Sequence, residues 1–165
     1  MIKNKLIYKL LLLNNIFVLC IFLCVKSYSS ETLVKNNFVV LGEDNSPVKI
    51  KIFSSLTCPH CANFHKNIVP QIEKNYVKLG KVQLIFIDFP LDEAALNASK
   101  LLHCLDKKKQ IEFLNIIYEK QKLWTSGSNL LEINNNLKKL VKDLGISSNQ
   151  FEKCLNNENI ENNIL

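Results

Sequence analysis

Arginine is absent from this chain of 165 residues, so all 21 basic residues are lysines. The bidentate clamps that guanidinium groups form on phosphates and carboxylates are therefore excluded. The formal net charge is +6, but Lys3, Lys5, Lys9 and Lys26 all precede Ser30 with no acidic residue among them. Without these four, 17 of the 21 lysines remain against 15 acidic residues, which gives a net charge of +2. The basic character belongs mainly to the N-terminal segment, and we expect no nucleic-acid partner.

A long uninterrupted apolar run is also lacking. The most apolar segment, residues 10–25, contains Asn14 and Asn15 and is shorter than the roughly 20 residues that cross a bilayer comfortably. The lysines before it and the small residues of Ser27-Tyr28-Ser29 predict a secretory signal peptide at residues 1–29. We therefore expect a periplasmic protein, with an uncleaved inner-membrane anchor as the alternative. Export would place the chain in an oxidising compartment, where disulfides persist.

The most informative feature present is Cys58-Pro59-His60-Cys61. This C-x-x-C motif follows an apolar run and opens a helical pattern, which is typical of a thioredoxin-like redox site. Unpaired N–H groups at a helix N-terminus stabilise an anion, so we predict a lowered pKa for Cys58, the attacking sulfur. Cys61, one turn inside, is the predicted resolving sulfur. Pro59 suits the first helical turn, and a protonated His60 would add positive charge beside both sulfurs.

A second C-x-x-C motif is missing, although structural zinc sites often use two. Half of a zinc site, with His65 as a third ligand, is the alternative interpretation of Cys58 and Cys61. Because a structural site needs about four ligands, we expect no metal at this position and no cofactor elsewhere.

Six cysteines occur in the chain, and Cys20 and Cys24 would leave with the signal peptide. The remaining four allow three pairings. We favour Cys58–Cys61 as the reactive pair and a structural disulfide between Cys104 and Cys154. The alternative is that the latter two are ordinary buried thiols on apolar helix faces.

Three apolar runs bounded by turn residues predict strands at residues 38–41, 48–53 and 82–87. The reactive motif opens a predicted helix that Pro70 interrupts, and a second helical segment follows to about Gly80. After Pro90 the period becomes helical. The expected helices are 93–106 capped by Asp92, 110–124, 129–144 capped by Ser128, and 151–155 preceded by a capping box at Ser147 and Gln150. Residues 156–165 are polar and weakly patterned.

Three stretches of this sequence resemble the DsbA-like branch of the thioredoxin superfamily. They are Val40 to Val48, the motif with its flanks from Ser55 to His65, and Asp88-Phe89-Pro90-Leu91-Asp92 followed by Ala94-Ala95-Leu96 and Cys104. The resemblance implies an α/β, thioredoxin-like fold in residues 30–165, with a helical insertion at about 92–155. It implies that Cys58 and Cys61 pass a disulfide to exported substrate proteins with free cysteines, and that a quinone-linked membrane partner re-oxidises them. Some relatives join cysteines at positions like Cys104 and Cys154.

Two features depart from that family pattern. Relatives have a cis-proline loop after the helical insertion, followed by two strands and a helix, but no proline of this chain follows Pro90. We therefore expect an incomplete domain whose C-terminal strands and helix are missing, or one that gains them from a partner or a second copy. Many relatives also carry an acid six residues before the first cysteine, where this chain has Ile52.

The predicted function is an exported protein thiol:disulfide oxidoreductase that donates the Cys58–Cys61 disulfide. Two alternatives remain open from the sequence. The chain could be a disulfide reductase or isomerase, or it could be a catalytically weak remnant or binding module.

Overall fold

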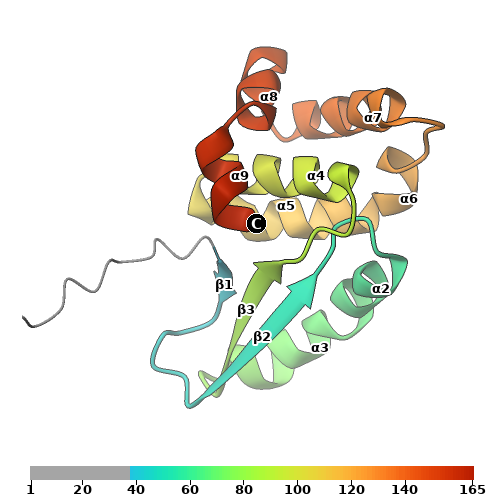
Figure 1. Cartoon of the computed structure of the whole chain (residues 1–165). Helices are drawn as coiled ribbons and strands as arrows, with labels where there is room; N and C mark the ends of the chain where they lie inside the picture. The colour runs from blue at the N-terminus through green and yellow to red at the C-terminus, as the bar shows by residue number, and fades with distance from the viewer. Residues whose placement is uncertain (1–37) are drawn as a thin grey trace, which may run out of the picture. The chain divides into compact units, whose positions relative to one another are not determined.

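The computed structural model describes residues 38–165 (Figure 1). Its sheet contains β1 (Val39–Leu41), β2 (Val48–Ser54) and β3 (Val82–Asp88) in the order β1-β3-β2. Strand β1 runs antiparallel to β3, whereas β2 runs parallel to β3 with Val48 opposite Val82 and Ser54 opposite Asp88. All three predicted strands are confirmed, with bounds that differ by one residue. The predicted signal peptide, residues 1–29, lies outside the described residues.

The chain leaves β1 beside the start of β3, and it bends there at Gly42. Gly42 has a φ of +110°, a backbone conformation that side chains other than glycine's rarely allow. A Cβ atom there would lie 2.8 Å from the carbonyl oxygen of Val82. Glycine at this position therefore lets β1 and β3 pair closely.

Helix α2 (Pro59–Asn67) follows β2, and α3 (Val69–Ile72) and the π-helical turn η1 (Glu73–Val77) come after it. The predicted interruption at Pro70 is confirmed, because this residue lies in the first turn of α3. Proline has no N–H to donate to the carbonyl four residues earlier, so α2 cannot continue through it. The chain then turns at Gly80, whose φ is +67°.

The rest of the described chain is helical: α4 (Glu93–Cys104), α5 (Lys107–Glu119), α6 (Gln121–Trp124), α7 (Leu130–Asp143), α8 (Ser148–Leu155) and α9 (Glu158–Ile164). The predicted caps of α4 and α8 are confirmed, since Asp92 accepts from the N–H of Ala95 and Ser147 from that of Gln150.

Two predictions in this region were wrong, and one helix was not predicted. The single helix at 110–124 begins earlier and divides at Lys120 into α5 and α6. Asn129, rather than Ser128, caps α7, since its side chain accepts from the N–H of Glu132. The tail forms α9, capped by Asn157. Lys100 of α4, which is buried, forms an ion pair with Glu161 of this helix.

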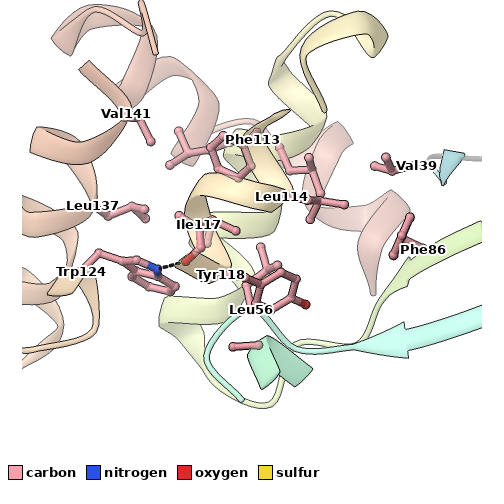
Figure 2. Close-up of a cluster of buried hydrophobic side chains, with 14 of the residues drawn as sticks. Val39, Leu56, Phe86, Phe113, Leu114, Ile117, Tyr118, Trp124, Leu137 and Val141 are labelled. Atoms are coloured by element: carbon pink, nitrogen blue, oxygen red, sulfur yellow. Dashed lines mark hydrogen bonds between the residues drawn. The ribbon is translucent and has the colours of Figure 1, made fainter. Parts of the chain in front are cut away.

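The main apolar core is formed by side chains of α4, α5, α6 and α7 together with residues of the sheet and of the loop after β2 (Figure 2). Its largest fully buried side chains are Trp124, Tyr118 and Phe113. The indole Nε1 of Trp124 donates to the carbonyl of Ile117 at 2.9 Å, so the polar atom of this buried ring is satisfied. This core fixes the helical layer against the segment that leads to Cys58.

Candidate active site

The two cysteines of the motif lie at the N-terminal end of α2. Cys58 is the N-cap residue, and its carbonyl accepts from the N–H of Ala62 at 3.1 Å. Pro59 occupies the first turn, where its missing N–H leaves no helical hydrogen bond unmade. In this structure Cys58 and Cys61 are both free thiols and both half-buried. Both residues are therefore partly accessible to solvent.

The two thiols differ in acidity. The backbone N–H of Cys61 hydrogen-bonds to the sulfur of Cys58 and lowers the pKa of Cys58, with further contributions from the Cys61 thiol and the N–H of His60. Burial raises the pKa of Cys61, as does its hydrogen bond to Cys58. The first proton therefore leaves Cys58, and its thiolate is held by donors of the first helical turn.

Pro59 and His60, the two residues between the cysteines, are exposed. His60 contributes to the acidity of Cys58 through its backbone N–H. The thiolate is stabilised here by the backbone, as at any helix N-terminus.

Gln121 of α6 holds the reactive loop, a role that the sequence did not reveal. Its Nε2 donates to the carbonyl of Leu56 at 2.8 Å and to that of Cys58 at 3.0 Å. The side chain is only 6% exposed. A lone glutamine at 63 residues from Cys58 carries no recognisable signal in a single sequence.

A second set of contacts ties the same loop to the start of α4. Thr57 donates to Asp92 at 2.7 Å, and its hydroxyl lies 3.0 Å from that of Ser55. Asp92 was predicted only as a helix cap; one of its oxygens caps α4 and the other anchors the loop. The cap signal was readable from sequence, whereas the contact across 35 residues was not.

A buried polar cluster lies at the C-terminal end of β3. Asp88 accepts from Ser99 at 2.5 Å and lies 2.5 Å from Nε2 of His103; the side chains of Asp88 and His103 are 9% and 4% exposed. On the neighbouring strand, Ser54 accepts from the hydroxyl of Tyr118 at 3.1 Å. Burial raises the pKa of this phenol. The buried carboxylate thus lies on β3, in register with Ser54 of β2.

The alternative zinc site would need His65 beside the cysteines. His65 is buried, and its Nε2 lies 2.8 Å from Oδ1 of Asn115 on α5. Burial lowers its pKa, so the imidazole is held neutral. Between Phe38 and Leu165 there is no group of three or more His, Cys, Asp or Glu side chains that could hold a metal ion.

In the same range no helix has the length and apolar character needed to cross a membrane.

Cys104 and Cys154 form a disulfide that joins the C-terminal ends of α4 and α8, with Cα atoms 5.9 Å apart. Cys154 is 1% exposed and belongs to the core. This pair lies in the helical region and closes a loop across 50 residues.

Comparison with known proteins agrees with this geometry. The profile of a family described as Thioredoxin matches residues 34–165. The chain belongs to the thioredoxin family. The crystal structure of Wolbachia pipientis alpha-DsbA1 superposes with a TM-score of 0.70 at 29% identity, covering 78% of this chain and 64% of that one.

Two sequence relatives point the same way. A Rickettsia typhi protein named as a protein-disulfide oxidoreductase is 32% identical over 133 residues, which are 80% of this chain and 48% of that protein. A Bacillus cereus protein named probable disulfide bond formation protein D is 29% identical over 147 residues, 84% of this chain and 66% of that protein. The predicted DsbA-like resemblance and the thioredoxin-like fold with a helical insertion are confirmed. The chain spans about half the length of the Rickettsia relative.

Proposed function

We propose that this chain is an exported thiol:disulfide oxidoreductase that donates the Cys58–Cys61 disulfide to substrate proteins. The observation that carries the proposal is the position of the two cysteines at the N-terminus of α2, where Cys58 is the N-cap residue and Cys61 lies in the first turn. Stabilising the thiolate of Cys58 stabilises the reduced form, which makes the disulfide a stronger oxidant. The names of the relatives support the same chemistry.

The reaction proceeds in two exchanges. A substrate thiolate attacks the sulfur of Cys58 in the oxidised pair; a mixed disulfide forms, and Cys61 leaves and takes up a proton. A second substrate thiolate then attacks the substrate sulfur of the mixed disulfide, and Cys58 leaves as the stabilised thiolate. The substrate loses two electrons and the cysteine pair gains them.

Export, a periplasmic location and re-oxidation by a quinone-linked membrane partner complete the proposal. Exported proteins with free cysteines are the substrates that this chemistry requires. The Cys104–Cys154 disulfide fits the same setting, because structural disulfides persist in oxidising compartments.

A trapping experiment tests the mixed disulfide through which donation passes. In the full chain, the Cys58 thiolate of Cys61→Ala should attack disulfide-bonded substrate proteins and expel one substrate thiolate; the resulting mixed disulfides should accumulate until a reductant releases them, because the resolving sulfur is gone. The matched variant Cys58→Ala should accumulate far fewer. If the two variants trap the same small amount, the proposed reaction does not occur at this motif.

A further inference from the structure

Cys61 holds a proton that it must lose whenever a disulfide re-oxidises the cysteine pair. In that step Cys61 attacks the sulfur of Cys58 in a mixed disulfide, and a thiol is nucleophilic only as its thiolate. Burial raises the pKa of Cys61, so the residue is protonated at neutral pH. A base beside Cys61 that removes the proton during the attack would therefore accelerate the exchange.

His65 lies one helical turn after Cys61 on α2. Residues four apart share one face of a helix, with Cβ atoms about 5–6 Å apart, and their side chains lean toward the preceding turn. The ring of His65 therefore lies over the turn that contains Cys61. Both side chains, together with Tyr118 of α5, line one cavity of about 400 Å³.

The hydrogen bonding of His65 shows which ring nitrogen is free. Its Nε2 lies 2.8 Å from Oδ1 of Asn115. An amide oxygen can only accept, so Nε2 carries the proton and Nδ1 of the neutral ring has a free lone pair. Nδ1 makes no hydrogen bond within residues 38–165. In that range the only fully buried side-chain nitrogen or oxygen without a partner is Oγ of Ser46, so Nδ1 reaches the cavity space that His65 lines.

The ring of His65 is held in place by two other elements. Its centroid lies 4.7 Å from that of Tyr118 on α5 and 5.6 Å from that of Phe86 on β3. His65 is 6% exposed. Burial lowers the pKa of His65, so the imidazole is unprotonated at neutral pH and can accept a proton.

The other side chains near Cys61 are poorer proton acceptors. Among residues 38–165, no Asp or Glu lines the cavity that Cys61 shares with His65. Burial raises the pKa of Tyr118, and its hydroxyl donates to Ser54 at 3.1 Å, so the phenol keeps its proton. His60 also lines the cavity but is exposed. It precedes Cys61 and is rotated by about 100° around the helix, away from the face that Cys61 and His65 share.

We propose that His65 accepts the proton of Cys61 at Nδ1 when Cys61 resolves a mixed disulfide on Cys58, and that Asn115 is the residue that positions the imidazole. A bond forms between the two cysteine sulfurs, the bond from Cys58 to the partner sulfur breaks, and the partner leaves as a thiolate. The imidazolium then releases the proton to water. The cysteine pair loses two electrons and the partner disulfide gains them. This inference rests on the proposed exchange at Cys58 and Cys61.

The probe is dithiodipyridine, an aromatic disulfide, mixed in equal amount with the reduced full chain. Attack by Cys58 releases one thiopyridone, and attack by Cys61 on the mixed disulfide releases a second, so the absorbance rises in two phases. Absence of the first phase would overturn the proposed function and this inference with it. A normal first phase, with a second phase that does not depend on His65, would overturn this inference alone.

The pH profile of the unsubstituted chain is the first measurement. The rate of the second phase should rise up to pH 6.5 as His65 loses its proton, stay level to pH 9.0, and rise again as Cys61 ionises. Without a base, the rate would rise about tenfold per pH unit across the whole range, in proportion to the thiolate. Such a steady rise would overturn the inference without any variant.

His65→Gln removes the base and keeps a side chain that can hydrogen-bond to Asn115. At neutral pH we expect the second phase to slow about a hundredfold, since general bases contribute roughly 10²–10⁴. The level part of the profile should disappear and the first phase should not change. Equal slowing of both phases would mean that His65 only supports the loop, and would overturn the inference.

A matched control is needed for the other groups around the imidazole. The titratable side chains that line the two cavities around His65 are those of Lys51, His60, Cys61, Lys66, Glu73, Tyr118 and Glu119. His60 is the other imidazole among them, so His60→Gln is the control. It should keep the level part of the profile, and its loss in His60→Gln would overturn the assignment to His65.

Asn115→Asp provides a test that does not require loss of a side chain. The two side chains have the same shape, and the new carboxylate still accepts from Nε2 of His65. Asn115 is exposed, so the carboxylate is ionised and its charge favours the imidazolium. We expect the rise of the second phase at low pH to move to higher pH, a shift that a structural defect does not produce. An unmoved rise would overturn the inference.

Discussion

Gln121 gives the sharpest test of how the reactive loop is positioned. Its amide nitrogen is the donor to the carbonyls of Leu56 and Cys58, at 2.8 and 3.0 Å. Gln121→Met removes the donor and keeps a flexible side chain of similar size. Each net hydrogen bond contributes about 0.5–1.5 kcal/mol, and a buried carbonyl left unpaired costs about 1–3 kcal/mol. The carbonyl of Cys58 keeps the N–H of Ala62, so we expect the free energy of unfolding to fall by about 2 kcal/mol.

The assay is denaturant unfolding of the reduced full chain, with Gln110→Met as the matched control. Gln110 is also 6% exposed, but its amide donates over longer distances, 3.3 and 3.5 Å, to Leu102 and Leu105. The control should therefore lose less than about 1 kcal/mol, since long hydrogen bonds are weak. Equal losses in the two variants would refute the reasoning.

A second readout separates positioning from simple destabilisation. The pKa of Cys58 is lowered chiefly by the backbone N–H of Cys61. If Gln121 fixes the loop so that this contact forms, Gln121→Met should move the pKa of Cys58 upward, toward 9.0. Gln110→Met should leave it unchanged. An unchanged pKa in Gln121→Met would limit this residue to stability alone.

Three further results are expected. Alkylation of the reduced chain, followed by mass spectrometry, should modify Cys58 before Cys61. The alkylation rate of Cys58 should reach half its maximum at a pH below 9.0. Equal rates for the two cysteines would contradict the assigned acidities. The free energy of unfolding should be greatest above pH 6.5 and fall as the pH drops below it. Burial lowers the pKa of His65, so this side chain binds a proton more readily in the unfolded chain than in the folded one. His65→Gln should therefore weaken the pH dependence of the free energy of unfolding below pH 6.5. Cys104→Ser combined with Cys154→Ser should lower the free energy of unfolding by about 4 kcal/mol in the chain-entropy model for a loop of this length. A loss below about 1 kcal/mol would argue that the disulfide does not constrain the unfolded state.

Local patterns were sufficient for most elements of the fold. The apolar run of β3 and the side-chain cap of Asp92 depend on residues close in sequence, so both were readable. The tail was missed because α9 has a weak apolar pattern. An ion pair joins it to α4 between Lys100 and Glu161, which are 61 residues apart. Ser128 was preferred over Asn129 because adjacent cap residues give the same signal; the structure assigns the cap to Asn129 and the N–H of Ser128 to Glu132.

The sequence by itself determined the chemistry of the reactive motif: two sulfurs one helical turn apart, with Pro59 at the first position of the helix that follows β2. These are properties of spacing and of helix geometry, which act over a few residues. The tertiary structure alone decided what surrounds the motif. Gln121 reaches Cys58, and Asp88 meets His103 at the end of β3. Each of these depends on packing between segments distant in sequence, which no local pattern encodes.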